Sequence, residues 1–409
     1  MEEWSQFYRQ LGDWPTETGR AGVWLSPAVN DPKWDDFLRR SPHGQYQQSS
    51  LWAEFKVGEG WNHHRVVTTG PGGITGGFQL LWKKKGPVRI GYVSKGPVAQ
   101  PGIPALRRGL IGFLRQSARE LGLQALIIQS PDEDQANEIS GDGQTDFIQS
   151  NPMDVIEATY LVDVTGDLET VRRRMNRKLR QCVRKAGEKG LVVRAGSEAD
   201  LPLFFELMSA TCRRQKSAPN PGSLDSLRRL WHLFARSGSI EMAFAHREGR
   251  DIAGRVNLVF GDRVTQWKKG WDGSHYDCHP NELLADNALE WAQARGYRVC
   301  DFSAINRLTA LHLLAGRTID SAEARSRDMF NLRLGGYPKL LPRAGLFIAN
   351  PVLRWGYLNS YGRFEKRRDR RRQAESSPRP PASGNVSPAP KLVLPPAGGG
   401  LVAPPSDHA

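Results

Sequence analysis

The same succession of apolar segments and helical patterns occurs twice along the chain. In its first part, an apolar segment at 88–92 leads through a helical pattern to a second apolar segment at 121–128. In its later part, 264–267 leads through a helical pattern to 295–302. Short apolar runs beside glycine predict strands, and apolar residues three and four apart predict helices. The repeat therefore predicts an α/β (or α+β) protein built from two similar lobes in tandem.

The repeat also sets the expected domain boundaries. The turn glycines Gly122 and Gly296 hold equivalent places in the two halves and lie one domain length apart. The joint falls near residue 160, where an acidic and polar stretch gives way to an apolar strand pattern. We therefore expect a first lobe at 22–160 and a second lobe at 161–345.

Two further segments follow the second lobe. Residues 346–372 join apolar and aromatic positions to an arginine-rich run, whereas residues 373–409 are rich in proline, alanine, glycine and serine. The second composition cannot bury enough apolar surface to fold, so we expect a disordered tail. Residues 346–372 either lie on an anionic membrane surface, which attracts basic side chains, or dock on the core as a terminal helix.

Composition narrows the classes of partner and compartment. The 409 residues are 39% hydrophobic, which is enough for a sizeable core, and the formal net charge of +14 favours polyanionic partners. The chain has no apolar run long enough to span a bilayer and no signal-peptide pattern at its start. Its four cysteines lack CxxC spacing. We therefore expect a cytoplasmic protein, either free or peripheral at the inner face of the membrane.

A lysine ends a short aromatic helix pattern. Trp52 and Phe55 recur at helical spacing after Ser49 or Ser50, either of which can cap the helix, so Lys56 projects from its last turn. Two interpretations remain at this point. Lys56 is either a solvated cation on an ordinary amphipathic helix or a cation that binds an anionic ligand.

The densest positive patch lies just after the predicted joint. Apolar residues at helical spacing from Val171 to Ala186 predict one amphipathic helix, with Asp167 as its N-cap and Gly190 as its stop. Arginine and lysine cover its other faces with hardly any acidic residue between them. Such a face either is solvated or contacts phosphate or an RNA backbone. The arginines we assign to that contact are Arg173, Arg177, Arg180 and Arg184.

A group of potential metal ligands stands alone in the sequence. His275, Asp277, Cys278 and His279 follow one another closely, but no second ligand set has the usual spacing for a tetrahedral zinc site. We therefore expect no metal ion and no bound cofactor.

Several short motifs between residues 22 and 345 occur in a fixed order. They are 48–56, 161–165 running into 175–180, 204–211 with Arg214, Pro280-Asn281, Trp291-Ala292 and 296–302. In this order they resemble the Fem family of peptidoglycan bridge aminoacyltransferases, of the FemA, FemB and FemX type. That family belongs to the acetyltransferase (GNAT) superfamily.

The resemblance implies both a fold and an activity. It implies two GNAT-like lobes and the transfer of an amino acid from aminoacyl-tRNA to an amine of a phosphate-bearing cell-envelope precursor, without a metal ion. It also implies that Lys56 and Arg214 grip the precursor's phosphates next to Trp52. Arginine suits a bidentate grip and lysine a point charge, so this pairing is chemically consistent.

Two departures from the family pattern leave the donor open. The family often has a Phe-Lys pair where this chain has Phe330-Asn331, and we expect Arg333 to supply the missing cation. The second lobe also lacks a long paired-helix insertion, which weakens the expectation of tRNA as a partner. Acyl-CoA is the alternative donor of a GNAT N-acyltransferase, although the glycine-rich pyrophosphate loop that holds it is missing between 270 and 281.

Three residues are candidates for the chemistry itself. Asp301 ends a predicted strand, where it is either a general base or orienting group for the amine, or a cap for the next helix. Lys268 and Lys269 follow Trp267 on the preceding strand, so one of them is expected to face the same site. A function of a different class also remains open, namely a noncatalytic basic adaptor that binds a membrane surface or RNA.

Overall fold

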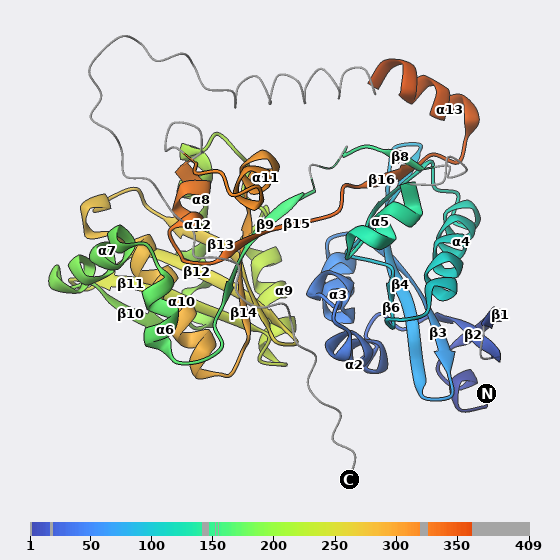
Figure 1. The fold of residues 1–409 in the computed structure, drawn as a ribbon, viewed down its shortest axis with the longest axis horizontal. Coiled ribbons are helices and arrows are strands. Elements are labelled where there is room, and N and C mark those ends of the chain that lie inside the picture. The colour runs from blue at the N-terminus through green and yellow to red at the C-terminus, as the bar shows by residue number, and fades with distance from the viewer. Residues whose placement is uncertain are drawn as a thin grey trace.

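The computed structural model describes residues 2–16, 19–140, 147–151, 153, 155–319 and 326–361. These residues form two α/β lobes, each built around its own sheet (Figure 1). The arginine-rich run and the proline-rich tail predicted beyond residue 361 lie outside the described residues.

The first sheet has the strand order β1-β2-β3-β4-β5-β7-β16-β8, with β6 paired to β4. Its strands are β1 (Arg9–Thr16), β2 (Gly19–Ser26), β3 (Asn62–Gly70), β4 (Gly73–Lys85), β5 (Val88–Ser94), β6 (Val98–Ala99), β7 (Ala125–Gln129), β8 (Phe147–Gln149) and β16 (Gly345–Phe347). The helices of this lobe are α1 (Glu2–Ser5), α2 (Pro32–Arg40), η1 (Tyr46–Gln48), α3 (Ser50–Gly58), α4 (Pro104–Glu120) and α5 (Glu133–Ser140).

The second sheet has the order β10-β11-β12-β13-β14-β9-β15. Its strands are β9 (Ala158–Asp163), β10 (Val192–Ala195), β11 (Ile240–Arg247), β12 (Arg250–Phe260), β13 (Arg263–Trp271), β14 (Val299–Ala304) and β15 (Tyr337–Leu340). The helices from residue 168 onward are α6 (Leu168–Arg174), α7 (Arg177–Glu188), η2 (Glu198–Asp200), α8 (Leu201–Arg214), α9 (Leu224–Ala235), η3 (Tyr276–Cys278), α10 (Pro280–Ala294), α11 (Arg307–Leu314), α12 (Ser326–Leu332), α13 (Pro351–Gly356) and η4 (Tyr357–Tyr361).

The predicted internal repeat is confirmed. In the first lobe, α4 connects the parallel strands β5 and β7; in the second, α10 connects the parallel strands β13 and β14. Both helices begin with proline, which fits the first helical turn because its missing N–H has no partner there. Each buries an apolar stripe against its own sheet, and full burial of one leucine contributes about 1.5–3 kcal/mol.

Both predicted lobe boundaries shift in the structure. The strand β9, from residue 158, already belongs to the second sheet, and β16, from residue 345, returns to the first sheet between β7 and β8. The expectation that residue 346 begins a separate surface segment is therefore wrong. Leu346 and Phe347 are buried because their strand pairs with β7 on one side and with β8 on the other.

The single basic helix predicted between 171 and 186 is also wrong. The chain forms α6 and α7, separated by Met175 in an extended conformation and by Asn176. The Asn176 side chain accepts a hydrogen bond from the backbone N–H of Lys178 at 2.8 Å and so caps α7. The apolar stripe looks continuous in the sequence because both helices bury it, Val171, Met175 and Leu179 in one core and Ala186 in another.

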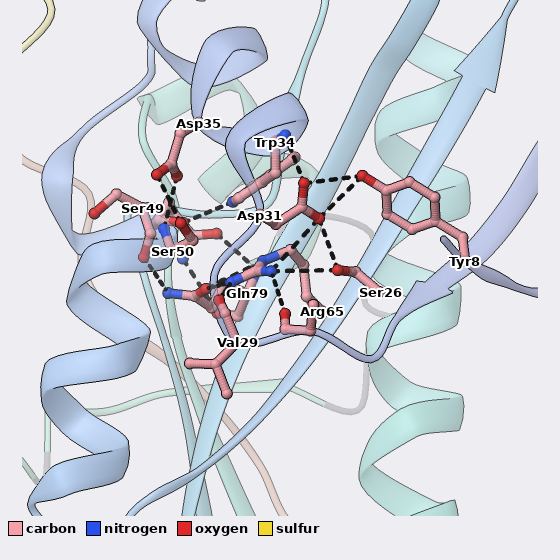
Figure 2. A network of polar contacts seen from close by, with 12 residues as sticks. Tyr8, Ser26, Val29, Asp31, Trp34, Asp35, Ser49, Ser50, Arg65 and Gln79 are labelled. Carbon is pink, nitrogen blue, oxygen red and sulfur yellow. Dashed lines mark hydrogen bonds and ion pairs between the residues drawn. The ribbon is translucent and has the colours of Figure 1, made fainter. Parts of the chain in front are cut away.

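A buried polar network holds the first lobe together (Figure 2). The Arg65 side chain on β3 is fully buried and donates to the Gln79 side chain at 2.6 Å and to the carbonyl of Val29 at 2.8 Å. It forms an ion pair with Asp31 at 3.5 Å, and Asp31 also accepts hydrogen bonds from the hydroxyls of Tyr8 and Ser26. Three strands and the start of α2 therefore meet at one buried cation.

The two lobes contact each other through α3 and α9, which lie between the sheets (Figure 1). Phe55 of α3 packs with Leu230 and Phe234 of α9 and with Leu258 of β12. At the edge of this apolar contact, Arg229 donates to the Glu59 carboxylate at 2.7 Å. The surface between the lobes is thus partly fixed by packing.

The buried network predicts a large stability effect. Replacing Arg65 by Met leaves Asp31 as an uncompensated buried charge, which should lower the free energy of unfolding by about 3–5 kcal/mol. Chemical denaturation followed by circular dichroism measures this difference. Arg108→Met, at an exposed position on α4, is the matched control and should change stability by less than about 0.5 kcal/mol. Equal stabilities of the two variants would contradict the role given to Arg65.

Candidate functional site

The helix predicted to present Lys56 is present as α3. The hydroxyl of Ser49 accepts a hydrogen bond from the backbone N–H of Trp52 at 3.2 Å, which makes Ser49 the N-cap. Phe55 is buried between the lobes, whereas Trp52 and Lys56 are only partly buried. The helix therefore directs an aromatic ring and a cation toward the region where the lobes meet.

The start of α3 is held by buried side chains of the first lobe (Figure 2). Both the backbone N–H and the hydroxyl of Ser50 donate to the carboxylate of Asp35, each at 2.7 Å. Gln79 donates to the carbonyl of Ser49 at 2.9 Å, and the indole N–H of Trp34 donates to the carbonyl of Gln48 at 2.7 Å. The polar part of the 48–56 motif is therefore structural, and it fixes the direction of the aromatic part.

Gln48 links the helix to the two central strands of the first sheet. Its amide group donates to the carbonyl of Ser94 at 2.7 Å and accepts from the backbone N–H of Gln79 at 2.8 Å. Gln48 is fully buried, and a Cβ atom at Gly96 would lie only 2.8 Å from its side chain. Glycine at position 96 therefore lets the chain after β5 pass directly over Gln48.

Lys56 lies in a box of aromatic rings. Its Nζ is 5.7 Å from the ring centres of Trp52 and Phe55 and 5.3 Å from that of Trp61. Burial lowers the pKa of Lys56, Glu59 opposes that shift, and Lys83 adds to it. Among the described residues, no hydrogen bond or ion pair reaches the Nζ atom. The ring faces stabilise the cation without neutralising it, which leaves Lys56 able to bind an anion.

The second lobe contributes Trp267 and Lys268 from β13. Trp267 packs on the same interlobe cluster as Trp52, and the Nζ atom of Lys268 lies 5.3 Å from the Trp267 ring centre. Burial lowers the pKa of Lys268. Lys269 instead has its Nζ atom 4.7 Å from the ring of Phe330, which belongs to a different cluster. Of the two predicted lysines, Lys268 is therefore the one that shares a cluster with α3.

Asp301 lies where two parallel strands separate. The last paired residues of β13 and β14 are Thr265 and Asp301, whereas the matching strands of the first lobe stay paired through five residues each. The Asp301 carboxylate accepts from the Thr159 hydroxyl and from the backbone N–H of Ser303 at 2.9 Å, and it pairs with Arg263 at 3.4 Å. A carboxylate that already accepts from three donors is held in one orientation, so it suits an orienting role better than that of a general base.

The helix-cap alternative for Asp301 is wrong. The helix that follows β14 is capped by Asn306, whose side chain accepts from the backbone N–H of Leu308 at 2.8 Å. Asp301 is instead almost fully buried at 8% exposure, and its charge acts on Tyr46 and Lys95 of the first lobe.

Lys95 is the main site residue that sequence reasoning missed. It follows β5, is only 5% exposed, and has an Nζ atom without a hydrogen-bond partner among the described residues. Burial lowers its pKa to about 7; Asp301 opposes the shift, while Arg263 and Lys339 add to it. The signal was a lysine before Gly96-Pro97 at the end of a predicted strand, but only the fold places it near Asp301.

Tyr46 connects Lys56 with Asp301. Its ring makes an edge contact with Trp52 at 5.2 Å between ring centres, and it packs on the interlobe cluster. Burial raises the pKa of Tyr46, and the charge of Asp301 raises it further. The candidate site thus groups Lys56, Trp52 and Tyr46 with Asp301, whose charge acts on Tyr46.

Arg214 lies at the end of α8. Its guanidinium donates to the carbonyl of Trp271 at 2.6 Å and lies 5.1 Å from the ring of the same residue, with one face open to solvent. Trp271 is four residues beyond Trp267 on β13, which corresponds to roughly 13 Å along a strand. Arg213 next to it is exposed as well. Arg214 is therefore held at the far end of the strand that carries Lys268.

Arg333 does not join this group. Its backbone carbonyl accepts from the N–H of Asn176, and its charge acts on the thiol of Cys182 in α7. Asn331 is buried and donates to the carbonyl of Phe302 at 3.3 Å. The expectation that Arg333 supplies a cation next to Lys56 gains no support from these positions.

Tertiary structure gives the basic helices acidic partners that the local sequence lacks. Arg172 pairs with Asp286 at 2.6 Å and with Glu290 at 3.1 Å, both on α10. One partner is local, because Arg184 pairs with Glu188 one turn further along α7 at 3.2 Å. All four arginines assigned to phosphate or RNA contact are exposed on the outside of α6 and α7: Arg173, Arg177, Arg180 and Arg184.

Comparison with known proteins identifies the fold and the relatives. The family model described as an acetyltransferase (GNAT) domain matches residues 171–308, in the second lobe. The crystal structure of FemX superposes with a TM-score of 0.63 at 17% sequence identity, covering 80% of this chain and 97% of FemX. The architecture is therefore that of FemX.

Curated relatives agree with this match. The lipid II:glycine glycyltransferase of Staphylococcus aureus (strain MRSA252) is 22% identical over 274 residues, which are 64% of this chain and 65% of that protein. The enzyme of the same name from Staphylococcus epidermidis (strain RP62A) is 24% identical over 255 residues, or 59% and 60% of the two chains. The chain is therefore similar to Fem proteins in sequence and to FemX in fold, and its second lobe matches the GNAT model. It spans less than two thirds of the length of these relatives, and the resemblance drawn from its motifs is confirmed.

Among the helices that the structure describes, none combines the length and the apolar character that a membrane span needs.

The burial of Lys95 predicts a pH-dependent stability. A pKa of about 7 in the folded state lies below the ordinary value, so the unfolded chain binds an extra proton between pH 7 and about 10. The stability of the wild type relative to Lys95→Met should therefore rise by about 1.4 kcal/mol per pH unit from pH 7 to 9, because Met cannot titrate. Urea denaturation at each pH measures this difference.

The control for this measurement is Lys84→Met, at an exposed position of β4. Its stability difference from the wild type should not change with pH. A constant difference for Lys95→Met as well would show that Lys95 keeps an ordinary pKa in the folded protein.

Proposed function

We propose that this protein transfers an aminoacyl group from aminoacyl-tRNA, or from another activated acyl donor, to an amine of a peptidoglycan or other cell-envelope precursor. The observation that carries the proposal is Lys56, a cation in an aromatic box at the junction of two GNAT-like lobes, with no ion pair to any of the described residues. The relatives named lipid II:glycine glycyltransferase support the class of acceptor.

The precursor's phosphates are the proposed ligands of Lys56 and Arg214. Lysine offers a point charge and arginine a fork of donors, and the two come from different lobes, Lys56 from α3 and Arg214 from the end of α8. Trp52 contributes an apolar face beside Lys56. A long, phosphate-bearing acceptor would therefore contact both lobes.

The transfer itself joins the acceptor amine to the acyl carbon and breaks the ester bond to the donor. A neutral amine attacks, its proton leaves, and the departing hydroxyl of the donor takes up a proton. In the proposed arrangement, Asp301 orients the amine, and Lys268 provides positive charge for the oxyanion that forms during attack. The buried amine of Lys95 has a pKa of about 7, so much of this amine is neutral at neutral pH.

The loop before α10 favours a donor other than acyl-CoA. The side chain of Asp272 accepts from the backbone N–H and the hydroxyl of Ser274, so this loop bonds within itself. The helix then begins at Pro280, which has no N–H to offer a phosphate. The exposed arginines of α6 and α7 instead offer a phosphate-binding surface suited to tRNA.

A peripheral membrane contact fits a lipid-linked acceptor. The short helices α13 and η4 expose Val352, Leu353, Trp355 and Leu358, with exposed fractions between 46% and 75%. The helix α13 lies beside the first lobe (Figure 1). Leu353 and Asn350 line a hollow there with Arg119. We propose that this apolar surface inserts into the inner face of the membrane next to the arginine-rich run.

The proposed contacts of Lys56 and Arg214 with the acceptor's phosphates predict the kinetics of two variants. Lys56→Met and Arg214→Met should each lower kcat/KM by at least tenfold, because each removes a charge-assisted contact of about 1.5–3 kcal/mol. Transfer of radiolabelled amino acids from mixed aminoacyl-tRNAs to lipid II measures the effect.

Matched controls separate this effect from general charge loss. Arg213→Met, next to Arg214, and Lys84→Met should keep kcat/KM within twofold of the wild type. If the wild type transfers no label to lipid II from aminoacyl-tRNA or acyl-CoA, yet binds anionic vesicles or RNA, the adaptor function replaces the enzyme.

The proposed membrane contact predicts a loss of vesicle binding. The double variant Leu353→Ser with Trp355→Ser should bind anionic phospholipid vesicles at least tenfold more weakly, because burial of each large apolar side chain contributes about 1.5–3 kcal/mol. Co-sedimentation measures the binding. Tyr276→Ser removes an aromatic ring of 77% exposure from the second lobe and should leave binding unchanged. Equal binding by all three proteins would reject α13 as the contact.

A further inference from the structure

Three metal-binding side chains meet in the second lobe, away from the surface that contains Lys56. They are Cys182 on α7, His279 just before α10, and Glu282 in the first turn of α10. The Cys182 Sγ atom, a ring nitrogen of His279 and a carboxylate oxygen of Glu282 all lie within 4.8 Å of one another. Nothing in the proposed acyl transfer uses this cluster.

The local fold explains why these side chains converge. Cys182 belongs to the apolar stripe of α7 and is 8% exposed, so its thiol faces inward toward α10. His279 adopts a left-handed backbone conformation with φ of 55°, and Glu282 follows it by one helical turn. The Nδ1 atom of His279 lies 3.9 Å from a Glu282 carboxylate oxygen, and both side chains are partly buried.

The spacing of these atoms fits a shared ion better than direct contacts. Among the described residues, no hydrogen bond joins Cys182 to His279 or to Glu282. In a tetrahedral zinc site, bonds of about 2.0–2.3 Å place neighbouring ligand atoms roughly 3.5 Å apart. A small side-chain rotation would bring the three atoms to that separation.

We propose that Cys182, His279 and Glu282 bind one zinc ion, with water in the fourth position. Thiolate, imidazole and carboxylate are the ligand types that zinc prefers. The thiolate and the carboxylate together balance the two charges of zinc, so the complex is neutral. A neutral complex is not repelled by Lys178, Lys185 and Arg333, whose charges act on the same thiol.

The proposal departs from the sequence-based expectation of no metal. That expectation rested on the lack of a partner ligand set for His275, Asp277, Cys278 and His279. The fold supplies the partner from α7, far away in the sequence, and selects only His279 from the original group. Cys278 is buried and its sulfur accepts from Arg247 at 3.1 Å, so it already has another role. A bound ion would tie the arginine-rich helix α7 to the start of α10.

Cobalt substitution tests the site directly and independently of transfer activity. The full chain, purified without a polyhistidine tag and stripped with a chelator, is titrated with Co²⁺, and the sulfur-to-cobalt charge-transfer absorption is recorded. Zn²⁺ is then added in competition. The expected result is one equivalent of Co²⁺ with thiolate absorption, displaced by one equivalent of Zn²⁺, and a Zn²⁺-dependent rise in Tm.

Variants assign the ligands. Cys182→Ser should remove the charge-transfer absorption, and His279→Ala and Glu282→Gln should each weaken binding at least tenfold. Cys212→Ser, which removes a cysteine from α8, is the matched control and should bind like the wild type. If Cys182→Ser fails to fold, His279→Ala and Glu282→Gln decide the question, because both positions are partly exposed. The absence of thiolate absorption in the wild type, or unchanged binding by the ligand variants, would overturn the proposal.

Discussion

The buried guanidinium of Arg65 is the interaction on which the geometry of the first lobe depends. It fixes Asp31 and Gln79, and Gln79 in turn holds the carbonyl of Ser49 and the side chain of Gln48. These contacts determine where α3 begins and therefore where its aromatic rings and Lys56 point. The buried charge of Arg65 thus determines the direction in which Lys56 points at the candidate site.

The cations of this chain fall into two physical classes. Arg65 and Arg255 are fully buried and fully bonded; Arg255 pairs with Glu241 at 3.0 Å and donates to Asn287 at 2.9 Å. Such groups stabilise only when every donor has a partner. Lys56 and Lys95 are the contrast, because Lys56 is partly buried and Lys95 almost fully buried, and neither has a bonded anion among the described residues. The difference separates cations that build the lobes from cations that remain for a ligand.

The two lobes share the strand, helix and strand connection but differ in how far their parallel strands stay paired. The parallel strands after the connecting helix stay paired along β5 and β7, whereas β13 and β14 separate after Thr265 and Asp301. Backbone groups beyond that point are open to other partners, such as the Ser303 hydroxyl, which donates to the carbonyl of Gln266 at 2.9 Å. The second lobe therefore supplies the Asp301 end of the candidate site, and the first lobe supplies its aromatic end.

The sequence alone determined the elements whose signals are local. The repeated strand, helix and strand, the helix that ends in Lys56 with its Ser49 cap, and the likeness to Fem proteins all follow from apolar periodicity and short motifs. Only the tertiary structure decided the features made by distant residues. It broke the basic helix at Asn176, inserted residues 345–347 into the first sheet, paired Arg172 with α10, and placed Lys95 near Asp301. The physical reason is that burial, ion pairing and pKa depend on neighbours in space, which a linear pattern does not record.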